Sequence, residues 1–264
     1  MKLSNRIKYL IKEILKDSQQ EKTKDEVNVC YYDIGCDHGK VGCELLKEDA
    51  TCKVAFCDIS EVNLDKAKLC VLKLYESKAF KGEDWPKNLK NRICFYRCDG
   101  VPKNLKERKG ETFKKIGLIF GLGGEAIKNI IQKDKLINEF YLQPATSLIE
   151  LRKFLYNGCF KIYKDYLFCD GKNFYDFIHV ERCNEVIDKS KMVKCVNFDE
   201  KLFGKDNLGR KDFDYQRFLI KQKHNLSKVL AKTNKNMLQL NVDKEKIETY
   251  KYMYDLINRQ IEGE

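Results

Sequence analysis

Acidic residues and glycines alternate over a short stretch of the chain, Asp33-x-Gly35-x-Asp37-x-Gly39. Apolar residues on either side predict a buried strand that begins over 27–29 and a helix that begins over 41–46. A turn between a strand and a helix brings backbone N–H groups and a helix N-terminus to the carboxyl edge of a sheet, where open α/β folds bind ligands. Because this turn carries carboxylates, it favours a ligand with positive charge.

The glycine spacing separates two classes of cofactor. A dinucleotide-binding turn, G-x-G-x-x-G started at Gly35, requires glycine where this chain has Asp37 and Lys40. The pattern present is typical of Rossmann-like methyltransferases that use S-adenosylmethionine, whose ammonium and sulfonium groups suit carboxylates. The alternative is an ordinary connection in which Asp33 caps the following helix.

Two more acids are expected at the same sheet edge. A second strand is predicted over Lys53–Asp58, and an acid at such a strand end accepts hydrogen bonds from ribose hydroxyls in nucleotide-type sites. A third strand is predicted over 92–98, and the acid after it, in Asp99-Gly100, is commonly near the adenine end of the cofactor in this fold class. The alternatives are a solvated carboxylate at Asp58 and a simple turn at Asp99-Gly100.

Strands and helices continue to alternate after the third strand. The expected elements are strands over 116–120 and 137–142, and helices over 60–80, 126–132 and 147–156. Strands over 160–168 and 173–182 flank Asp170-Gly171, which predicts a hairpin. We therefore expect an α/β fold of the Rossmann-like class I methyltransferase type, with a mostly parallel seven-stranded sheet closed by an antiparallel hairpin.

Two loops at the carboxyl edge of this sheet have distinctive sequences. The run Gly121-Leu122-Gly123-Gly124 lets the backbone pass close to a ligand or to another segment. In Gln143-Pro144, the proline stops the strand and leaves the Gln143 side chain near the sheet edge.

The two ends of the chain predict helices. Apolar residues at helical spacing over 1–17 predict an amphipathic helix packed on the main domain, and Glu13 and Asp17 argue against a targeting sequence. From about Asn207 onward, two apolar stripes predict helices paired antiparallel as a coiled coil and joined over 233–243. The stripes are Phe218, Leu219, Leu226, Val229 and Leu230, followed by Ile247, Tyr250, Tyr254, Ile257 and Ile261. We expect a methyltransferase domain over 1–200 and a basic helical hairpin over 201–264.

The chain is basic, with a formal net charge of +11 over 264 residues. Ten Lys or Arg against three acids lie over 201–235, and eleven against five lie over 81–115. This excess indicates a polyanionic partner, most often nucleic acid, and makes Lys221 and Lys228 candidate substrate contacts. The alternatives are a solvated lysine-rich face and a lysine-rich bias of the whole proteome.

The 12 cysteines form no C-x-x-C pair, so their spacing does not favour a zinc site. Cys30, Cys57 and Cys94 fall in apolar strand patterns, where a reduced thiol behaves as a small hydrophobe. No apolar run reaches the roughly 18 residues of a membrane span, and no secretory signal is evident. We expect a cytoplasmic protein from a reducing compartment, without a structural metal or membrane contact, that works as a monomer.

Six motifs, in order along the chain, resemble those of the bacterial tRNA adenine-22 N1-methyltransferases. They are Leu3-Ser4-x-Arg6-Ile7, Asp33-Ile34-Gly35-Cys36-Asp37-His38, Phe120-Gly121-Leu122-Gly123-Gly124, Leu142-Gln143-Pro144, Arg152-Lys153-Phe154-Leu155 and Asp170-Gly171-Lys172-x-x-Tyr175. The resemblance implies methyl transfer from S-adenosylmethionine to N1 of an adenine in the D-arm region of tRNA. It also implies that the helical hairpin over 201–264 is tRNA-binding. It further implies that the cofactor is held by Asp33, Ile34, Gly35, Cys36, Asp58, Ile59, Asp99, Gly100, Gly121, Leu122 and Gly123.

The same resemblance places Asp37, His38, Gln143 and Pro144 beside the target base. Asp37 is the candidate to stabilise the positive charge that reaches the adenine ring, and Gln143 to hydrogen-bond the adenine edge. His38 either assists later proton loss or is a structural histidine bonded to the backbone. Arg6 either grips the RNA or closes over the cleft; the alternative is a buried ion pair.

The chain departs from the family pattern at three places. The proline of D-H-x-x-L-P is replaced by Gly42, the later G-P is Gly204-Lys205, and Asp58 stands where the family often has Glu. Two other functions remain open: a methyltransferase acting on another RNA site or on a protein, and a protein that binds cofactor or RNA without turnover. The combination of Asp33, Asp58 and Asp99 argues against a decayed site.

Overall fold

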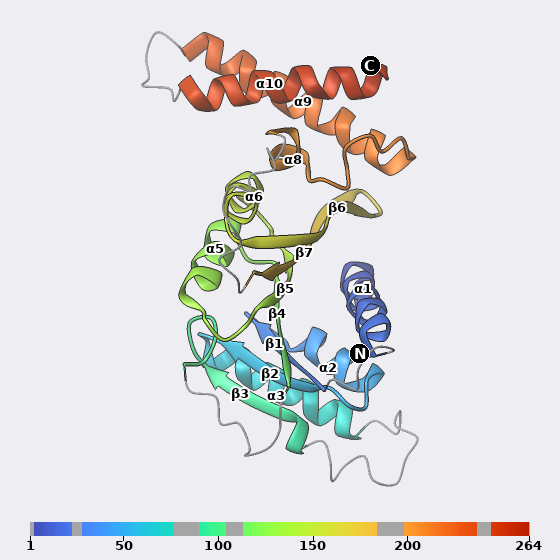
Figure 1. Ribbon diagram of the computed structural model, residues 1–264, viewed down its shortest axis with the longest axis vertical. Helices are drawn as coiled ribbons and strands as arrows, with labels where there is room; N and C mark the ends of the chain where they lie inside the picture. The colour runs from blue at the N-terminus through green and yellow to red at the C-terminus, as the bar shows by residue number, and fades with distance from the viewer. Residues whose placement is uncertain are drawn as a thin grey trace.

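One seven-stranded sheet runs through the molecule in the order β3-β2-β1-β4-β5-β7-β6 (Figure 1). The computed structural model describes residues 3–22, 28–76, 90–103, 113–183, 198–236 and 244–263. The strands are β1 (Val29–Ile34), β2 (Lys53–Asp58), β3 (Ile93–Arg97), β4 (Lys114–Phe120), β5 (Glu139–Gln143), β6 (Phe160–Asp170) and β7 (Asn173–Arg182). The first five strands are parallel, and β7 lies antiparallel between β5 and β6. The predicted sheet is therefore confirmed, hairpin included.

The strand order reverses between β1 and β4. From β1, the chain proceeds outward to β2 and β3, then returns to place β4 on the other side of β1. In open α/β sheets, ligands bind at such a reversal, outside the carboxyl ends of the strands. The turn after β1 and the loop after β4 both lie there.

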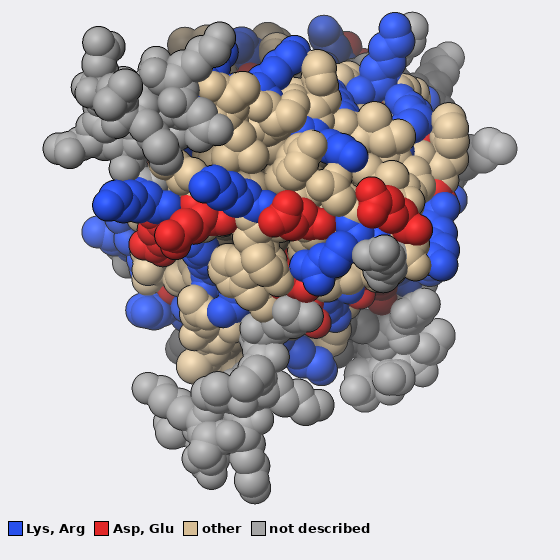
Figure 2. Space-filling view, turned by 90° about the horizontal axis from the view of Figure 1, so that it is seen from above, with Lys and Arg blue, Asp and Glu red and all other residues tan. Residues whose placement is uncertain are grey.

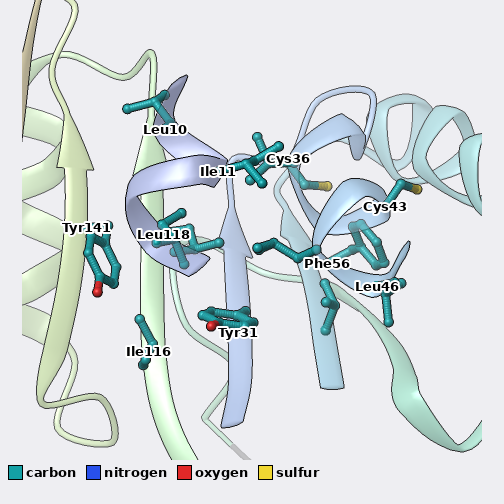
Figure 3. Close-up of a cluster of buried hydrophobic side chains, with 14 of the residues drawn as sticks. Leu10, Ile11, Tyr31, Cys36, Cys43, Leu46, Phe56, Ile116, Leu118 and Tyr141 are labelled. Atoms are coloured by element: carbon teal, nitrogen blue, oxygen red, sulfur yellow. The ribbon is translucent and has the colours of Figure 1, made fainter. Parts of the chain in front are cut away.

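Helices cover both faces of the sheet. One face packs against α1 (Asn5–Lys22), α2 (Lys40–Glu48) and α3 (Glu61–Glu76), and the other packs against α5 (Gly124–Lys133) and α6 (Leu148–Asn157). Neighbouring strand residues point to opposite faces, so Tyr31 belongs to the first core and Tyr32 to the second. Figure 3 shows Leu10 and Ile11 of α1 beside the strand residues of the first core. The predicted packing of the N-terminal helix on the main domain is confirmed.

The C-terminal part of the chain forms α8 (Phe198–Phe203), α9 (Phe213–Asn236) and α10 (Lys244–Glu262). The helices α9 and α10 lie antiparallel at one end of the molecule (Figure 1). Leu219, Leu226 and Ile257 are buried between them, together with residues of α8. Val229 is 41% exposed, so its expected place in the apolar stripe is wrong; it lies toward the outer surface of the pair. The expected domain boundary between residues 200 and 201 falls inside α8.

The segment between α8 and α9 is bound to the outer side of β6, the last strand of the sheet. The backbone N–H of Asp165 donates to the Asp206 carboxylate at 2.7 Å, and that of Leu167 donates to the Asn207 side-chain oxygen at 2.8 Å. The Arg210 guanidinium donates to the Leu167 carbonyl at 2.7 Å. These bonds fix the direction in which α9 leaves the sheet.

A buried arginine supports the same junction from inside. The Arg152 guanidinium contacts the carboxylates of Asp165 at 2.7 Å and Asp176 at 2.9 Å, and it donates to the Leu202 carbonyl of α8 at 3.0 Å. Gly204 lies against this cluster with φ +85°, where a side chain would meet both Asp165 and Arg152.

Some expectations differ from the structure or lie outside what it describes. Cys94 is exposed on β3, so its expected role as a buried hydrophobe is wrong, because β3 is an outer strand with a partly open face. The helix α3 is described to Glu76, and the expected end near Phe80 lies outside the described residues. Across the residues that the structure describes, the cysteines are free, no group of metal-binding side chains is present, and no helix is long and apolar enough to cross a membrane.

Candidate active site

A pocket of about 720 Å³ opens at the carboxyl edge of the sheet, where the strand order reverses. Its walls come from the turns after β1, β2, β3 and β4, and the first turns of α1 form part of its rim. Elements distant in sequence therefore meet around one cavity.

Most of the predicted site residues line this pocket. They are Arg6, Asp33, Ile34, Gly35, Cys36, Asp37, His38, Asp58, Ile59, Asp99, Gly100, Gly121 and Leu122. Five predicted residues do not line it: Gly123, Gln143 and Pro144 lie behind its wall, and Lys221 and Lys228 lie on α9.

The turn after β1 depends on left-handed backbone conformations. Gly35 has φ +70°, and a Cβ there would press on the Leu122 side chain, which comes from the opposite loop. Gly39 has φ +65° and precedes α2, where a Cβ would lie 2.8 Å from Ala67 of α3. Asp37 adopts φ +47° between them, a conformation that Asp and Asn tolerate better than most residues. These constraints explain why the motif alternates glycine with acid.

Asp33 is buried, with 5% of its surface exposed at the base of the pocket. Its carboxylate accepts the backbone N–H of Gly42, in the first turn of α2, at 3.1 Å. The capping interpretation therefore holds for this contact, although a second oxygen is left for the pocket. Burial, together with the nearby carboxylates of Asp58 and Asp37, raises the pKa of Asp33 to about 7, while the Gly42 hydrogen bond opposes the rise. A bound cation would relieve this concentration of negative charge.

Asp58 organises the turn that contains Asp37. Its carboxylate accepts the backbone N–H of Asp37 at 3.2 Å, the backbone N–H of Ser60 at 2.8 Å and the side-chain amide of Asn63 at 3.3 Å. This is not the solvated strand-end carboxylate of the alternative interpretation, since only 6% of its surface is exposed. Ribose binding by Asp58 stays a prediction.

Asp37 and His38 lie at the mouth of the pocket with their side chains largely exposed. The His38 Nε2 is 3.6 Å from the Asp37 carboxylate, and Lys66 of α3 is 3.9 Å from it. Neither side chain packs in the hydrophobic core, so both are accessible to a ligand that enters the pocket from solvent.

Asp99 also lies at the rim and is paired with Lys133 of α5 at 3.3 Å. Both side chains are exposed, so the pair contributes little to stability. The following Gly100 has φ +89° and packs against Ile130, which confirms a turn here and leaves a role toward adenine as a prediction.

The glycine run after β4, Gly121 to Gly124, borders the pocket at one end and contacts the segment after β5 at the other. Its first two residues, Gly121 and Leu122, face the pocket. Its last two contact the segment after β5: the Gly124 N–H donates to the Thr146 carbonyl at 2.8 Å, and a Cβ on Gly124 would collide with the Ser147 carbonyl oxygen. Both interpretations of this run, approach to a ligand and approach to another segment, apply to different halves of it.

We expect Gly124→Ala to lower the free energy of unfolding by about 1–3 kcal/mol, because the added methyl group must displace the backbone near Ser147. Thermal unfolding measures this, and Glu125→Ala, at an exposed neighbouring position, is the matched control. Equal melting temperatures for the two variants would contradict the close approach.

Gln143 is buried, with 1% of its surface exposed, and it points away from the pocket. Its amide nitrogen donates to the Pro144 carbonyl at 2.8 Å, and its backbone carbonyl accepts the Gly121 N–H at 2.9 Å. Its side-chain oxygen has no hydrogen-bond partner among the described residues. In this structure Gln143 supports the loop that lines the pocket, and contact with a substrate would require its side chain to turn.

Arg6 lies at the rim, over the ring of Tyr175 at 5.3 Å from its centroid. Its own backbone N–H donates to the Asp170 carboxylate at 3.2 Å. Within the described residues its guanidinium is half-buried and forms no ion pair, which contradicts the alternative of a buried salt bridge.

Several lining residues were not expected from the sequence. They are Ser4, Ile7, Leu10, Lys40, Val41, Asn63, Cys98, Phe120 and Ile130. The amphipathic pattern of the N-terminal segment predicts a packed helix, yet periodicity alone does not indicate which part of the sheet the helix covers. The sequence does contain a signal for Asn63, because this residue follows Asp58 near the start of a predicted helix and has a side chain that can cap it.

Comparisons with known proteins agree with this geometry. A family model described as "Methyltransferase domain" matches residues 21–178. A putative tRNA methyltransferase of Mycoplasma genitalium is 35% identical over 176 residues, which are 64% of this chain and 72% of that protein. Among solved structures, M. capricolum TrmK in complex with S-adenosyl-homocysteine is 20% identical, covers 98% of each chain and has a TM-score of 0.66. The B. subtilis m1A22 tRNA methyltransferase TrmK is 17% identical, with 98% of this chain and 99% of that chain covered and a TM-score of 0.68.

Proposed function

The chain belongs to the methyltransferase family, and we propose that it transfers the methyl group of S-adenosylmethionine to N1 of adenine 22, in the D-arm region of tRNA. The observation that carries this proposal is the convergence of Asp33, Asp37 and Asp58 on one pocket at the reversal of the strand order. The named functions of the M. genitalium relative and of the structural neighbours support the choice of tRNA.

The charged and apolar residues that line the pocket suit this cofactor. S-adenosylmethionine supplies an activated methyl group and carries two positive charges, on its ammonium and sulfonium. Asp33 and Asp37 provide negative charge where the turn after β1 enters the pocket, and Asp58 and Asp99 extend it toward β3. Ile59 is 68% exposed beside Asp58, and its apolar side chain gives the adenine ring of the cofactor a surface to pack on.

The target atom needs little help from the protein. N1 of adenine is neutral at physiological pH and has a free lone pair, so no base has to remove a proton before methyl transfer. Positive charge develops on the ring as the methyl group arrives, and we propose that the Asp37 carboxylate, which lines the pocket, stabilises it. N1 lies on the pairing edge of adenine, so the base must be unpaired or extruded before it enters.

Helix α9 of the C-terminal pair provides the charge that attracts RNA. Lys221 and Lys228 are exposed on α9, which carries Arg217, Lys221, Lys223, Lys228, Lys232 and Lys235 against Asp214 as its one acid. We assign 1–200 to catalysis and 201–264 to RNA binding, and we propose that the enzyme works as a cytoplasmic monomer. Free cysteines across the described residues suit the reducing environment of that compartment.

Incubation of the protein with methyl-labelled S-adenosylmethionine and unmodified tRNA transcripts tests the proposal. We expect 1-methyladenosine at position 22, identified by mass spectrometry of nucleosides and of mapped fragments. A transcript with guanosine at position 22 is the matched control and should gain no label. Methylation elsewhere would favour the alternative of another RNA site, whereas cofactor binding without transfer to any RNA would favour a protein substrate or a non-catalytic protein.

Asp37→Asn tests the charge-stabilising role directly. Asparagine tolerates the left-handed backbone at this position, which alanine does not, so the turn is preserved. We expect the rate of methyl transfer under saturating conditions to fall about 100-fold, with the Kd for tRNA unchanged. Glu48→Gln, on the exposed end of α2, is the control variant. A normal rate in the Asp37 variant would remove this residue from the mechanism.

A further inference from the structure

The turn between β6 and β7 connects the pocket rim to the first turns of α9. On one side, the Asn5 side-chain amide and the Arg6 backbone N–H of α1 both donate to the Asp170 carboxylate at 3.2 Å. On the other side, the Arg217 guanidinium of α9 donates to the Gly171 carbonyl at 3.2 Å. Three segments distant in sequence are thus held together at this tip of the hairpin.

Cations and aromatic rings alternate across this junction. Arg6 lies 5.3 Å from the centroid of the Tyr175 ring, and Lys221 lies 5.4 Å from that of Phe174. Arg217 lies 5.6 Å from the centroids of both Phe174 and Phe213. We call Arg6, Tyr175, Phe174, Lys221, Arg217 and Phe213 the hairpin band.

The rings of the band differ in exposure: Tyr175 and Phe174 are half-buried and pack against apolar clusters, whereas Phe213 is largely exposed. Phe213, at the first position of α9, is 76% exposed and is absent from the apolar cluster that joins the C-terminal helices. The acids beside the band are already engaged: Asp170 accepts bonds from α1, and Asp214 is paired with Arg217 at 3.2 Å. Lys172, exposed in the turn itself, adds positive charge.

The surface at the end of the molecule formed by α9 and α10 carries mixed charge, unlike the hairpin band. Seen from the end formed by α9 and α10, basic and acidic side chains alternate in a row across the surface (Figure 2). The α10 sequence agrees, because it carries four Lys or Arg and four acids. Because its charges are balanced, this face would attract a polyanion only weakly.

We propose that the hairpin band is the track along which unpaired nucleotides of the substrate RNA pass from the basic face of α9 to the pocket. An exposed aromatic ring such as that of Phe213 can stack on a base, and the neighbouring Arg and Lys can pair with phosphates, which is how proteins hold single-stranded nucleic acid. The band begins at Arg6, a residue of the pocket rim, so a strand bound along it leads to the site of methyl transfer. This inference rests on the proposed action on tRNA and names the surface that guides the RNA.

Paired charge variants test the phosphate contacts. Arg217→Gln with Lys221→Gln removes two positive charges from the band, and Lys244→Gln with Lys251→Gln removes two exposed ones from α10. We expect the first pair to raise the Kd for an unmodified tRNA transcript at least tenfold and to reduce the slope of log Kd against log salt by about 1–2. The α10 pair should change the Kd less than threefold. Equal weakening by both pairs would overturn the proposal, since it would indicate attraction by net charge alone.

Paired aromatic variants test the stacking. We expect Phe213→Ala to raise the same Kd about five- to tenfold. We expect Phe198→Ala, at an exposed ring that packs edge-to-face against Tyr252, to leave it unchanged. The Kd for S-adenosylmethionine should stay within twofold in every variant, which shows that the fold is intact. RNA binding that depends on the band without methylation of tRNA would refute the proposed function and leave the track standing. Methylation with RNA binding indifferent to the band variants would refute the track alone.

Discussion

Asp33→Asn is expected to weaken binding of S-adenosylmethionine about 100-fold and, at the same time, to stabilise the protein without ligand. Binding weakens because a buried carboxylate at the base of the pocket is lost, and one partner of a buried charge pair is worth several kcal/mol. The asparagine side-chain oxygen still accepts the Gly42 N–H, so the turn into α2 keeps its support.

The gain in stability follows from the raised pKa of Asp33. The folded-state pKa is about 7 and the unfolded value is 3.8, so folding is opposed by the ionised carboxylate as the pH rises from about 4 to 7. Above pH 7 this opposition amounts to roughly 4 kcal/mol as an upper bound. The neutral asparagine avoids it, and the stability gain at pH 8 should fall by more than half at pH 5, where the folded wild-type carboxyl is protonated.

Two measurements check the Asp33 prediction. Isothermal titration gives the Kd for S-adenosylmethionine, and chemical unfolding at pH 5 and pH 8 gives the stability. The wild-type protein should also bind the cofactor more tightly as the pH rises from 6 to 8, because a bound cation favours the ionised carboxylate. Asp65→Asn, on the exposed side of α3, is the matched control and should change none of these quantities. A variant that loses cofactor binding and stability together would show that Asp33 is needed for the fold alone.

Arg152→Met is expected to destabilise the protein by about 3–5 kcal/mol, the largest stability effect that we anticipate. Removal of this guanidinium leaves the fully buried Asp165 and its neighbour Asp176 without their cation. Burial already raises the pKa of Asp176 to about 6, and Arg152 opposes this rise. Without it, both carboxylates must be protonated or become solvated for the chain to fold.

Chemical unfolding measures the Arg152 effect, with Lys153→Met as the control because Lys153 is its partly exposed neighbour on α6. Adding Asp165→Asn to the Arg152 variant should recover part of the loss, since one uncompensated charge disappears. Additive losses in the double variant would mean that the two groups act independently, contrary to their 2.7 Å contact.

The site residues that could be predicted from the sequence are those that lie at the carboxyl ends of strands. Asp33 and Asp58 lie at the carboxyl ends of β1 and β2, and Asp99 follows β3. The carboxyl ends of parallel strands meet at one edge, so the convergence of these acids follows from the order of the elements along the chain. The alternation of glycine and acid after β1 is equally informative, because few residues adopt its backbone conformations.

Side-chain direction could not be derived in the same way. Gln143 stands at a strand end like the acids, yet it turns inward to the Pro144 carbonyl. The hydrogen bonds that make Asp58 a support for Asp37 depend on how two loops face each other, which spacing along the chain does not reveal. The misplaced Cys94 and Val229 have a common cause: an apolar pattern indicates a face, and whether that face is covered depends on tertiary neighbours.

The hydrogen bonds between β6 and the segment after α8 bear on how copies of the protein behave toward each other. An outer strand with free N–H and C=O groups is a template for strand pairing between molecules and hence for aggregation. Here Asp206, Asn207 and Arg210 occupy those groups on β6, while the opposite outer strand, β3, is only five residues long and carries Arg97. The chain that leads to α9 and α10 therefore also protects this edge from self-association, and a protein shortened before α8 would leave the backbone groups of β6 at Asp165 and Leu167 free to pair with another strand.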